Sequence, residues 1–405
     1  MVVARILGKT QFGELAMLRS TTMAFAMIAC LGLAQTSTKH IAGFRSKEPQ
    51  RAAKVLGLSL VVTAISSIIF AVIFFIGSSH ISETFFHASH LASGLRIVSL
   101  LIIGTALNRI QTSILAGFEA FRQIAICSFV RGFAGGSIFV LGAYFGGING
   151  ALLGLVGSLA VNCIISYLFI SLQAEKAGIR PSYTNFGSEL HLLWKYALPV
   201  LICVMTVAPV EWIANAMLGR QQNGYAELGM FQAARQWLIV IVFIPQMLGQ
   251  VLLPLLSNLW SLRKRKAFIK VLITTMSITA GIVFSFAIPI ALFSPKIMMI
   301  YGKDFSGAPH ILIIICGVSV IKSLNVIIIQ VFWSLGAVKL AVVANVLRAV
   351  SILTLFYLWG MTNAGTLALA YLSGGTVSFV FQGVCLFCIL RSLREPTDEI
   401  QVQVT

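Results

Sequence analysis

The chain has 405 residues, of which 58% are hydrophobic and only 10% charged, and its mean hydropathy is +0.94. This composition lies far from that of soluble globular proteins and leaves no stretch for a soluble domain. We therefore expect a polytopic membrane protein, all-α in fold class. The formal net charge is +17. Because we expect a protein embedded in a phospholipid bilayer, we do not interpret this charge as a sign of a nucleic-acid partner.

Apolar segments of about 20 residues, the length that crosses roughly 30 Å of hydrocarbon as a helix, recur along the whole chain. In chain order, the predicted spans are 13–36, 55–77, 94–117, 124–145, 150–173, 196–218, 226–256, 268–293, 309–334, 340–359 and 364–390. These are eleven transmembrane helices. The segment 226–256 is too long for one straight crossing, so Pro245 and Pro254 predict a kink or a continuation of the helix beyond the membrane.

The loops between these spans alternate in their content of lysine and arginine. The basic set comprises the loops 37–54, 118–123, 174–195 and 257–267, the turn at Lys339 and the tail from Arg391. By the positive-inside rule this set is cytoplasmic, which places the C-terminus inside and the N-terminus outside. An outside N-terminus in turn predicts that a first helix of the bundle is missing.

The chain repeats itself at a spacing of about 215 residues. FGELAMLR at 12–19 returns as YAELGMFQ at 225–232, and Asn108 and Arg131 return as Asn325 and Arg348. Both copies of the phrase open a span of the same direction, which predicts two parallel-repeat bundles of five and six helices around a central cavity. The predicted division is an N-terminal bundle 1–173, a cytoplasmic linker 174–195, a C-terminal bundle 196–390 and a tail 391–405.

Basic side chains within the predicted spans far outnumber acidic ones. The cations are Arg19, Arg96, Arg109, Arg131, Arg235, Lys322 and Arg348, against Glu14 and Glu211. Facing lipid, they would cost on the order of 15 to 25 kcal/mol together. Pairing with carboxylates is the alternative, but two carboxylates cannot neutralise seven cations. We predict a positive cavity whose substrate-binding residues are Arg19, Arg109, Arg131, Arg235, Lys322 and Arg348, because guanidinium groups bind phosphate oxygens bidentately.

Polar residues at helical spacing accompany two of these cations. Thr105, Arg109 and Thr112 share one helix face, and Ser319 shares a face with Lys322. Glu211 is a candidate for ion coupling; its alternative role is to pair with an arginine. No histidine or cysteine pattern predicts a metal site, and we expect neither a cofactor nor catalytic residues.

Glycines at 142, 146, 150 and 154 recur every four residues across a predicted turn. Residues without side chains let two helices approach closely. This pattern predicts tight packing of the two spans that flank the turn.

Four segments together resemble the bacterial polysaccharide flippases of the Wzx type, within the superfamily that also holds MATE exporters and the lipid II flippase. They are ARILGKTQFGEL (4–15), AGFEAFRQ (116–123), AELGMFQAARQWLIVIVFIPQMLGQVLLPLLSNL (226–259) and IYGKDFSGA (300–308). The resemblance implies two six-helix bundles, alternating access, and export of an undecaprenyl-diphosphate-linked oligosaccharide such as an O-antigen unit. It also implies a place in lipopolysaccharide biosynthesis beside other polysaccharide assembly proteins.

Two other classes of function remain as alternatives. A MATE-like ion-coupled exporter of small cations is expected to place acids in its cavity, whereas this chain places bases in its spans. A membrane-embedded polymerase or ligase of the same pathway is expected to carry a long outer loop, whereas the longest outer loop here has about 16 residues.

Overall fold

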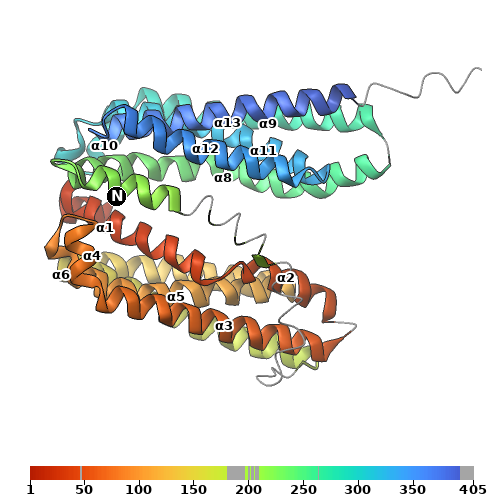
Figure 1. Ribbon diagram of the computed structural model, residues 1–405, viewed down its shortest axis with the longest axis horizontal. Helices are drawn as coiled ribbons and strands as arrows, with labels where there is room; N and C mark the ends of the chain where they lie inside the picture. The colour runs from red at the N-terminus through yellow and green to blue at the C-terminus, as the bar shows by residue number, and fades with distance from the viewer. Residues whose placement is uncertain are drawn as a thin grey trace, which may run out of the picture. The chain divides into compact units, whose positions relative to one another are not determined.

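A computed structural model describes residues 1–45, 48–179, 197–198, 201, 205, 209–262 and 264–392. Every regular element within these ranges is a helix, which confirms the predicted fold class (Figure 1). The chain forms two compact units, Met1–Met230 and Phe231–Thr405, and their internal structures are taken one at a time.

The first unit begins with a long helix that is broken close to the C-terminal end of the predicted span 13–36. Its elements are α1 (Val2–Ala29), α2 (Leu33–Phe44), α3 (Pro49–Ile76), α4 (Ser78–Thr84), the 3-10 turn η1 (Ser89–Leu91), α5 (Ala92–Gly117) and α6 (Phe121–Lys176), followed by helical residues 209–219 and the start of α8 (Gly224–Ser261). Buried apolar side chains such as Leu56 and Ile110 form a core between α2, α3, α5 and α6.

The second unit holds the remainder of α8 and the helices that follow it. These are α9 (Arg265–Leu292), α10 (Ser294–Ile300), the 3-10 turn η2 (Lys303–Phe305), α11 (Pro309–Ser334), α12 (Val338–Leu358) and α13 (Ala364–Ser392). Its core joins Leu256, Phe268 and Phe332 from α8, α9 and α11. Helix α8 runs as one helix through both Pro245 and Pro254, so the excess length of this segment continues the helix to Ser261.

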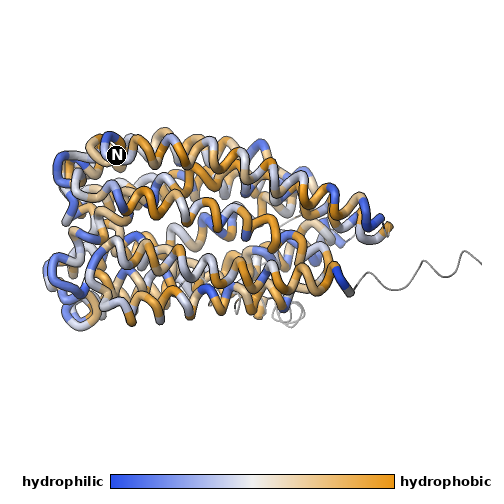
Figure 2. The backbone as a smooth tube through the Cα atoms, turned by 90° about the horizontal axis from the view of Figure 1, so that it is seen from above, coloured by the Kyte–Doolittle hydropathy of each residue, from blue (hydrophilic) through white to orange (hydrophobic). Residues whose placement is uncertain are grey.

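Among the described residues, eight helices are long and apolar enough to cross a membrane, or nine if α1 and α2 form one bent span. The protein is therefore a multi-pass membrane protein. The predicted number of eleven is not confirmed: α6 counts once although it contains two predicted spans, and much of the predicted span 196–218 lies outside the described residues. Apolar residues line the helices and polar residues gather toward their ends (Figure 2).

Helix α6 is a hairpin of two antiparallel arms, because the backbone leaves helical geometry at Gly146 and Gly147. A Cβ atom at Gly142 would lie 2.2 Å from the carbonyl oxygen of Gly150, and one at Gly154 would lie 2.7 Å from that of Ile138. Only glycine permits such close approach of the backbones. The predicted tight packing of the spans beside this turn is confirmed.

The break between α1 and α2 also depends on glycine. The two helices meet at 47°, and Leu31 and Gly32 both have positive φ. A Cβ atom at Gly32 would lie 2.3 Å from the carbonyl oxygen of Ala197. A left-handed residue ends a helix, and the absence of a side chain at position 32 permits this contact, so the segment cannot continue straight as the sequence pattern suggested.

The predicted boundaries between bundle, linker and tail stay a prediction, because the linker 174–195 and the tail 391–405 lie mostly outside the described residues. The internal packing of each unit nevertheless agrees with the repeat. In α6, Gly135 packs on Ser158; at equivalent positions of the second unit, Ile352 packs on Gly374.

Candidate functional site

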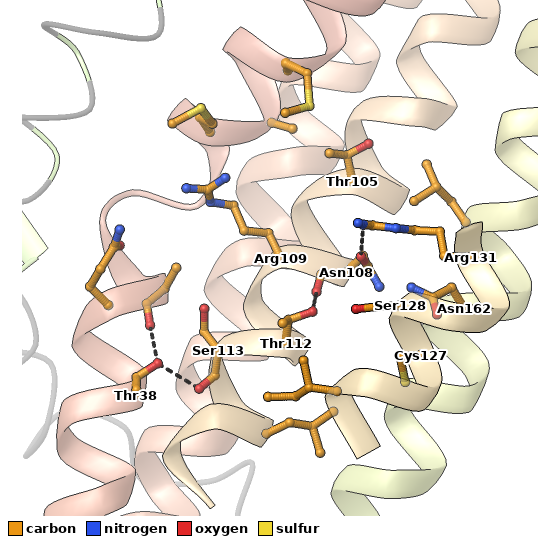
Figure 3. Close-up of a pocket in the computed structure, with 18 residues that line it drawn as sticks. Thr38, Thr105, Asn108, Arg109, Thr112, Ser113, Cys127, Ser128, Arg131 and Asn162 are labelled. Atoms are coloured by element: carbon orange, nitrogen blue, oxygen red, sulfur yellow. Dashed lines mark hydrogen bonds between the residues drawn. The ribbon is translucent and has the colours of Figure 1, made fainter. Parts of the chain in front are cut away.

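A cavity of about 410 Å³ lies within the first unit, beside the break between α1 and α2. Figure 3 shows the side chains that line it, which come from α1, α2, α5 and α6. Its walls combine apolar residues such as Met23, Met27 and Leu159 with a polar group centred on α5. A mixed wall of this kind is typical of ligand sites.

Two arginines predicted to bind substrate line this cavity. Arg109 extends from α5 and Arg131 from the first arm of α6 (Figure 3). The Nη1 atom of Arg131 donates to the Oδ1 atom of Asn108 at 3.1 Å, which fixes the direction of this guanidinium. Among the described residues, no hydrogen bond or ion pair holds the guanidinium of Arg109, which is half-buried.

Hydroxyl groups of α5 complete the polar wall. Thr105 and Thr112 line the cavity with Arg109, so the predicted common face of these three residues is confirmed. The Thr112 hydroxyl donates to the backbone oxygen of Asn108 at 2.8 Å, and the Thr38 hydroxyl of α2 donates to that of Ser113 at 2.8 Å. The first bond lies within α5, and the second ties α2 to α5.

Among the residues that the structure describes, the lining of this cavity includes two guanidinium groups and no carboxylate. In a medium of low dielectric, uncompensated charges interact strongly with any ion that enters, because solvent screens them little. The lining therefore favours an anion, and the planar guanidinium groups suit phosphate or carboxylate oxygens.

Asn162, in the second arm of α6, belongs to the same wall but is absent from the predicted set (Figure 3). Its residue is 3% exposed and its Oδ1 atom has no hydrogen-bond partner within the described structure. The signal was present in the sequence: the hairpin register set by Gly142 and Gly150 places Asn162 opposite Arg131.

Arg19 lies elsewhere in the first unit, on α1, and is not among the residues that line this cavity. Its guanidinium carbon lies 5.8 Å from the ring centre of Phe139, within cation–π range. Glu211, the predicted ion-coupling residue, interacts electrostatically with Arg19. This agrees with the alternative reading in which Glu211 pairs with an arginine, and leaves ion coupling untested.

The other three predicted cations belong to the second unit. Arg235 lies on α8, Lys322 on α11 and Arg348 on α12, and all three are half-buried. Arg235 and Lys322 interact with other groups of the protein, and Arg348 interacts electrostatically with Tyr371. A single cavity shared by all six cations stays a prediction.

Two of the motifs that carried the family resemblance have structural roles. In the segment AGFEAFRQ, Glu119 forms an ion pair of 2.7 Å with Arg45, which also donates to the Phe118 carbonyl. In IYGKDFSGA, Gly302 has a φ of +133°, and burial raises the pKa of the neighbouring Tyr301 to about 12. The phenol therefore stays protonated at physiological pH and donates to the Oε1 atom of Gln236 at 3.2 Å.

Within the described ranges, no group of three or more histidine, cysteine, aspartate or glutamate side chains is arranged to hold a metal ion. The cavity lining likewise contains no such group. The chemistry available to the cavity is therefore that of guanidinium, amide and hydroxyl groups.

Comparison with known proteins gives consistent matches. Residues 1–260 match the model of a family described as "Polysaccharide biosynthesis protein". The EPS I polysaccharide export inner membrane protein EpsE of Ralstonia solanacearum is 26% identical over 375 residues, which cover 90% of this chain and 84% of that protein. The protein of the same name from Ralstonia nicotianae is 25% identical, and the match spans 64% of this chain and only 58% of that relative.

The lipid III flippase of Escherichia coli K12 is 25% identical over 292 residues, which cover 69% of each protein. Among solved structures, an inward-facing MATE family multidrug resistance transporter of the MOP superfamily gives a TM-score of 0.78 at 13% identity, over 97% of this chain and 95% of that one. The lipid II flippase MurJ, in an inward closed conformation, gives 0.73 at 16% identity, over 98% and 92%. At these identities the structural likeness concerns the fold, and it confirms the MATE-like architecture that the resemblance implied.

Proposed function

Because the chain belongs to the polysaccharide biosynthesis protein family, we propose that it is a flippase for an undecaprenyl-diphosphate-linked oligosaccharide. It moves this lipid from the cytoplasmic to the outer face of a bacterial inner membrane by alternating access. The names of the relatives, a polysaccharide export protein and a lipid III flippase, support this class of cargo. An O-antigen or similar repeat unit is the glycan that we propose.

The observation that carries the proposal is a cavity with Arg109 and Arg131 in its wall and no carboxylate among its described lining residues. A diphosphate is the part of a polyprenyl-linked sugar that these groups can recognise, whatever glycan follows it. We assign to Arg131 a fixed bidentate contact, because Asn108 already orients its guanidinium. Arg109, which has no such bond, can adjust to the second phosphate.

The remaining predicted cations, Arg19, Arg235, Lys322 and Arg348, are proposed to bind the same diphosphate at another stage of its passage. Glu211 is proposed as the residue whose protonation couples transport to an ion gradient. The C-terminal tail is proposed to lie in the cytoplasm, following the distribution of basic loops.

A MATE-like exporter of small cations is the second candidate, favoured by the fold it shares with the inward-facing transporter. The charge of the described cavity argues against it, because a cation would meet two guanidinium groups and no carboxylate. The relatives are transporters and flippases, which supports a function without catalysis.

The test is binding of undecaprenyl diphosphate to the purified protein, measured by native mass spectrometry, together with glycan export in a flippase-null strain. Arg131→Ala should lower affinity by about tenfold to a hundredfold and abolish export, and Arg131→Lys should restore part of both, since it keeps the charge without the planar fork. Arg122→Ala is the matched control, because Arg122 is exposed nine residues earlier on α6. Equal binding and export by Arg131→Ala and the parent, at matched expression, would remove Arg131 from the site.

A further inference from the structure

The start of α8 lies directly against α1 at one end of the first unit. A Cβ atom at Gly13 would lie 1.8 Å from the carbonyl oxygen of Tyr225, and one at Gly229 would lie 2.0 Å from that of Lys9. These glycines belong to the repeated phrases of the sequence, so the two copies of the phrase meet backbone to backbone. Loop charges predict that this end faces outward.

The segment between α4 and α5 crosses this contact and is bound on its α8 side. The Tyr225 hydroxyl donates to the carbonyl oxygen of Phe86 at 2.8 Å. Arg220 donates to the carbonyl oxygens of Phe85 and Thr84 at 2.7 and 3.2 Å. We refer to residues 84–90 as the strap.

On its α1 side, the strap is held by a pair of ionisable groups. The Nε2 atom of His90 lies 2.7 Å from the Oε1 atom of Glu14. The Glu14 side chain is only 8% exposed, whereas that of His90 is 62% exposed and lines a pocket of about 260 Å³. Solvent protons can therefore reach the imidazole, while the carboxylate that it contacts is buried.

The strap contains two histidines, His87 and His90, and His90 is the one for which the structure shows an ion pair. An imidazole ordinarily changes charge between about pH 5 and 8. In its cationic form it makes a charge-assisted bond to a carboxylate, and such bonds are roughly twice as strong as neutral ones. The contact between strap and α1 is then stronger in acid and weaker as pH rises.

The neighbouring elements carry other charged and titratable groups. They are Arg5 and Lys9 on α1, Glu83 and His87 in the segment 78–91, Arg96 on α5, and Arg220, Tyr225 and Glu227 at the start of α8. Arg96 donates to the Ser78 hydroxyl at 3.3 Å, and Tyr225 interacts electrostatically with both Glu14 and Arg220. The turn of α6 at 146–149 adds no charged side chain.

We propose that the strap fastens the start of α8 to α1 at this end of the first unit, and that Glu14 and His90 form its proton-sensitive anchor. Acid tightens the strap and favours the closed contact between the glycines. Higher pH loosens it, so that α1 and α8 separate more readily. The proposal is independent of which lipid the protein carries.

The experiment is hydrogen–deuterium exchange of the full-length protein in lipid nanodiscs, at pH 5.5 and pH 8.5, corrected for the intrinsic pH dependence of amide exchange. We expect the protection of peptides over 84–91 to fall by about threefold to tenfold between the two pH values. His90→Gln keeps a hydrogen-bond donor without a titratable charge, and Glu14→Gln keeps the shape of the acid. Both variants should lose the pH dependence.

His80→Gln is the matched control, since His80 is an exposed histidine of α4 and should behave as the parent does. Tyr225→Phe should lower protection at both pH values without changing their ratio, because it removes the bond on the α8 side. Peptides from α11 report whether each variant is folded. Equal corrected protection of the strap at both pH values in the parent would overturn the proposal. Protection that still depends on pH in a folded His90→Gln variant would overturn it as well. No lipid substrate is present, so either result leaves the proposed flippase function undecided.

Discussion

Replacing Gly13 by alanine should loosen the first unit although alanine is the better helix former. In a helix interior, Gly→Ala ordinarily stabilises by about 1 kcal/mol. At Gly13 the added Cβ would lie 1.8 Å from the Tyr225 carbonyl oxygen and 2.8 Å from the Gly229 amide nitrogen. Both atoms belong to backbone, so the helices must separate by roughly 1.5 Å, given that non-bonded carbon contacts lie near 3.5 Å.

The energy of that separation decides the sign of the effect. Overpacking of a well-packed contact costs about 1 to 3 kcal/mol, and more where backbone must move. Because backbone must move here, the upper end of this range applies, and subtracting the gain of about 1 kcal/mol in helix propensity leaves a net loss of about 2 kcal/mol. A loss of this size corresponds to a fall in melting midpoint on the order of 5 °C for a unit of this length.

The assay is thermal unfolding in detergent followed by intrinsic fluorescence, and Gly132→Ala on α6 is the matched control. A Cβ at Gly132 meets no atom within 4 Å, so that variant should melt at the parent temperature or slightly above it. Gly229→Ala should resemble Gly13→Ala. If Gly13→Ala melts together with Gly132→Ala, the close contact between α1 and α8 does not exist as described.

Three further predictions concern other sites. Gly142→Leu should destabilise the protein by about 2 kcal/mol or more in the same melting assay, because the side chain would displace Gly150 in the hairpin of α6. Gly302→Ala should lower stability by about 1 kcal/mol or more, since φ is +133° there, and a parent-like melting curve would contradict the assigned turn. Asn108→Asp should leave the fold intact but weaken undecaprenyl diphosphate binding at least tenfold in native mass spectrometry, because the new carboxylate would pair with Arg131; binding equal to that of the parent would count against the cavity.

The sequence predicted the ends of the helices more accurately than it predicted where helices break or bend. Hydropathy alone placed α5, α11 and α13 within two residues of their observed ends. It joined α1 to α2 because periodicity carries no information on backbone dihedral angles, and Gly32 looks like any small residue within an apolar run. Hydropathy also does not predict which residues of the two α6 arms lie opposite each other. The spacing of the glycines is needed to set that register.

The candidate site was predicted in part for a related reason. Counting charges identified Arg109 and Arg131, since a buried excess of cations has to be compensated. Asn162 could not be found in this way, because an amide carries no charge and occurs often in helices. Its place in the wall depends on which residues of the two arms lie opposite each other, which the sequence indicates only when the glycine spacing is used to set the register of the hairpin.

The two halves of the repeat use equivalent residues differently, and this bears on where the proposed diphosphate would bind. In the first unit, Asn108 accepts a bond from Arg131. In the second, the Nδ2 atom of Asn325 donates to the Gly375 carbonyl at 3.3 Å, and within the described part of that unit its Oδ1 atom has no partner. Arg348 is therefore not held by the amide that its repeat equivalent uses. A guanidinium fixed in advance loses less conformational entropy when it binds an anion, so Arg131 is the better placed of the two to hold a phosphate firmly. If the proposed diphosphate reaches both residues, we expect Arg348 to make the weaker contact.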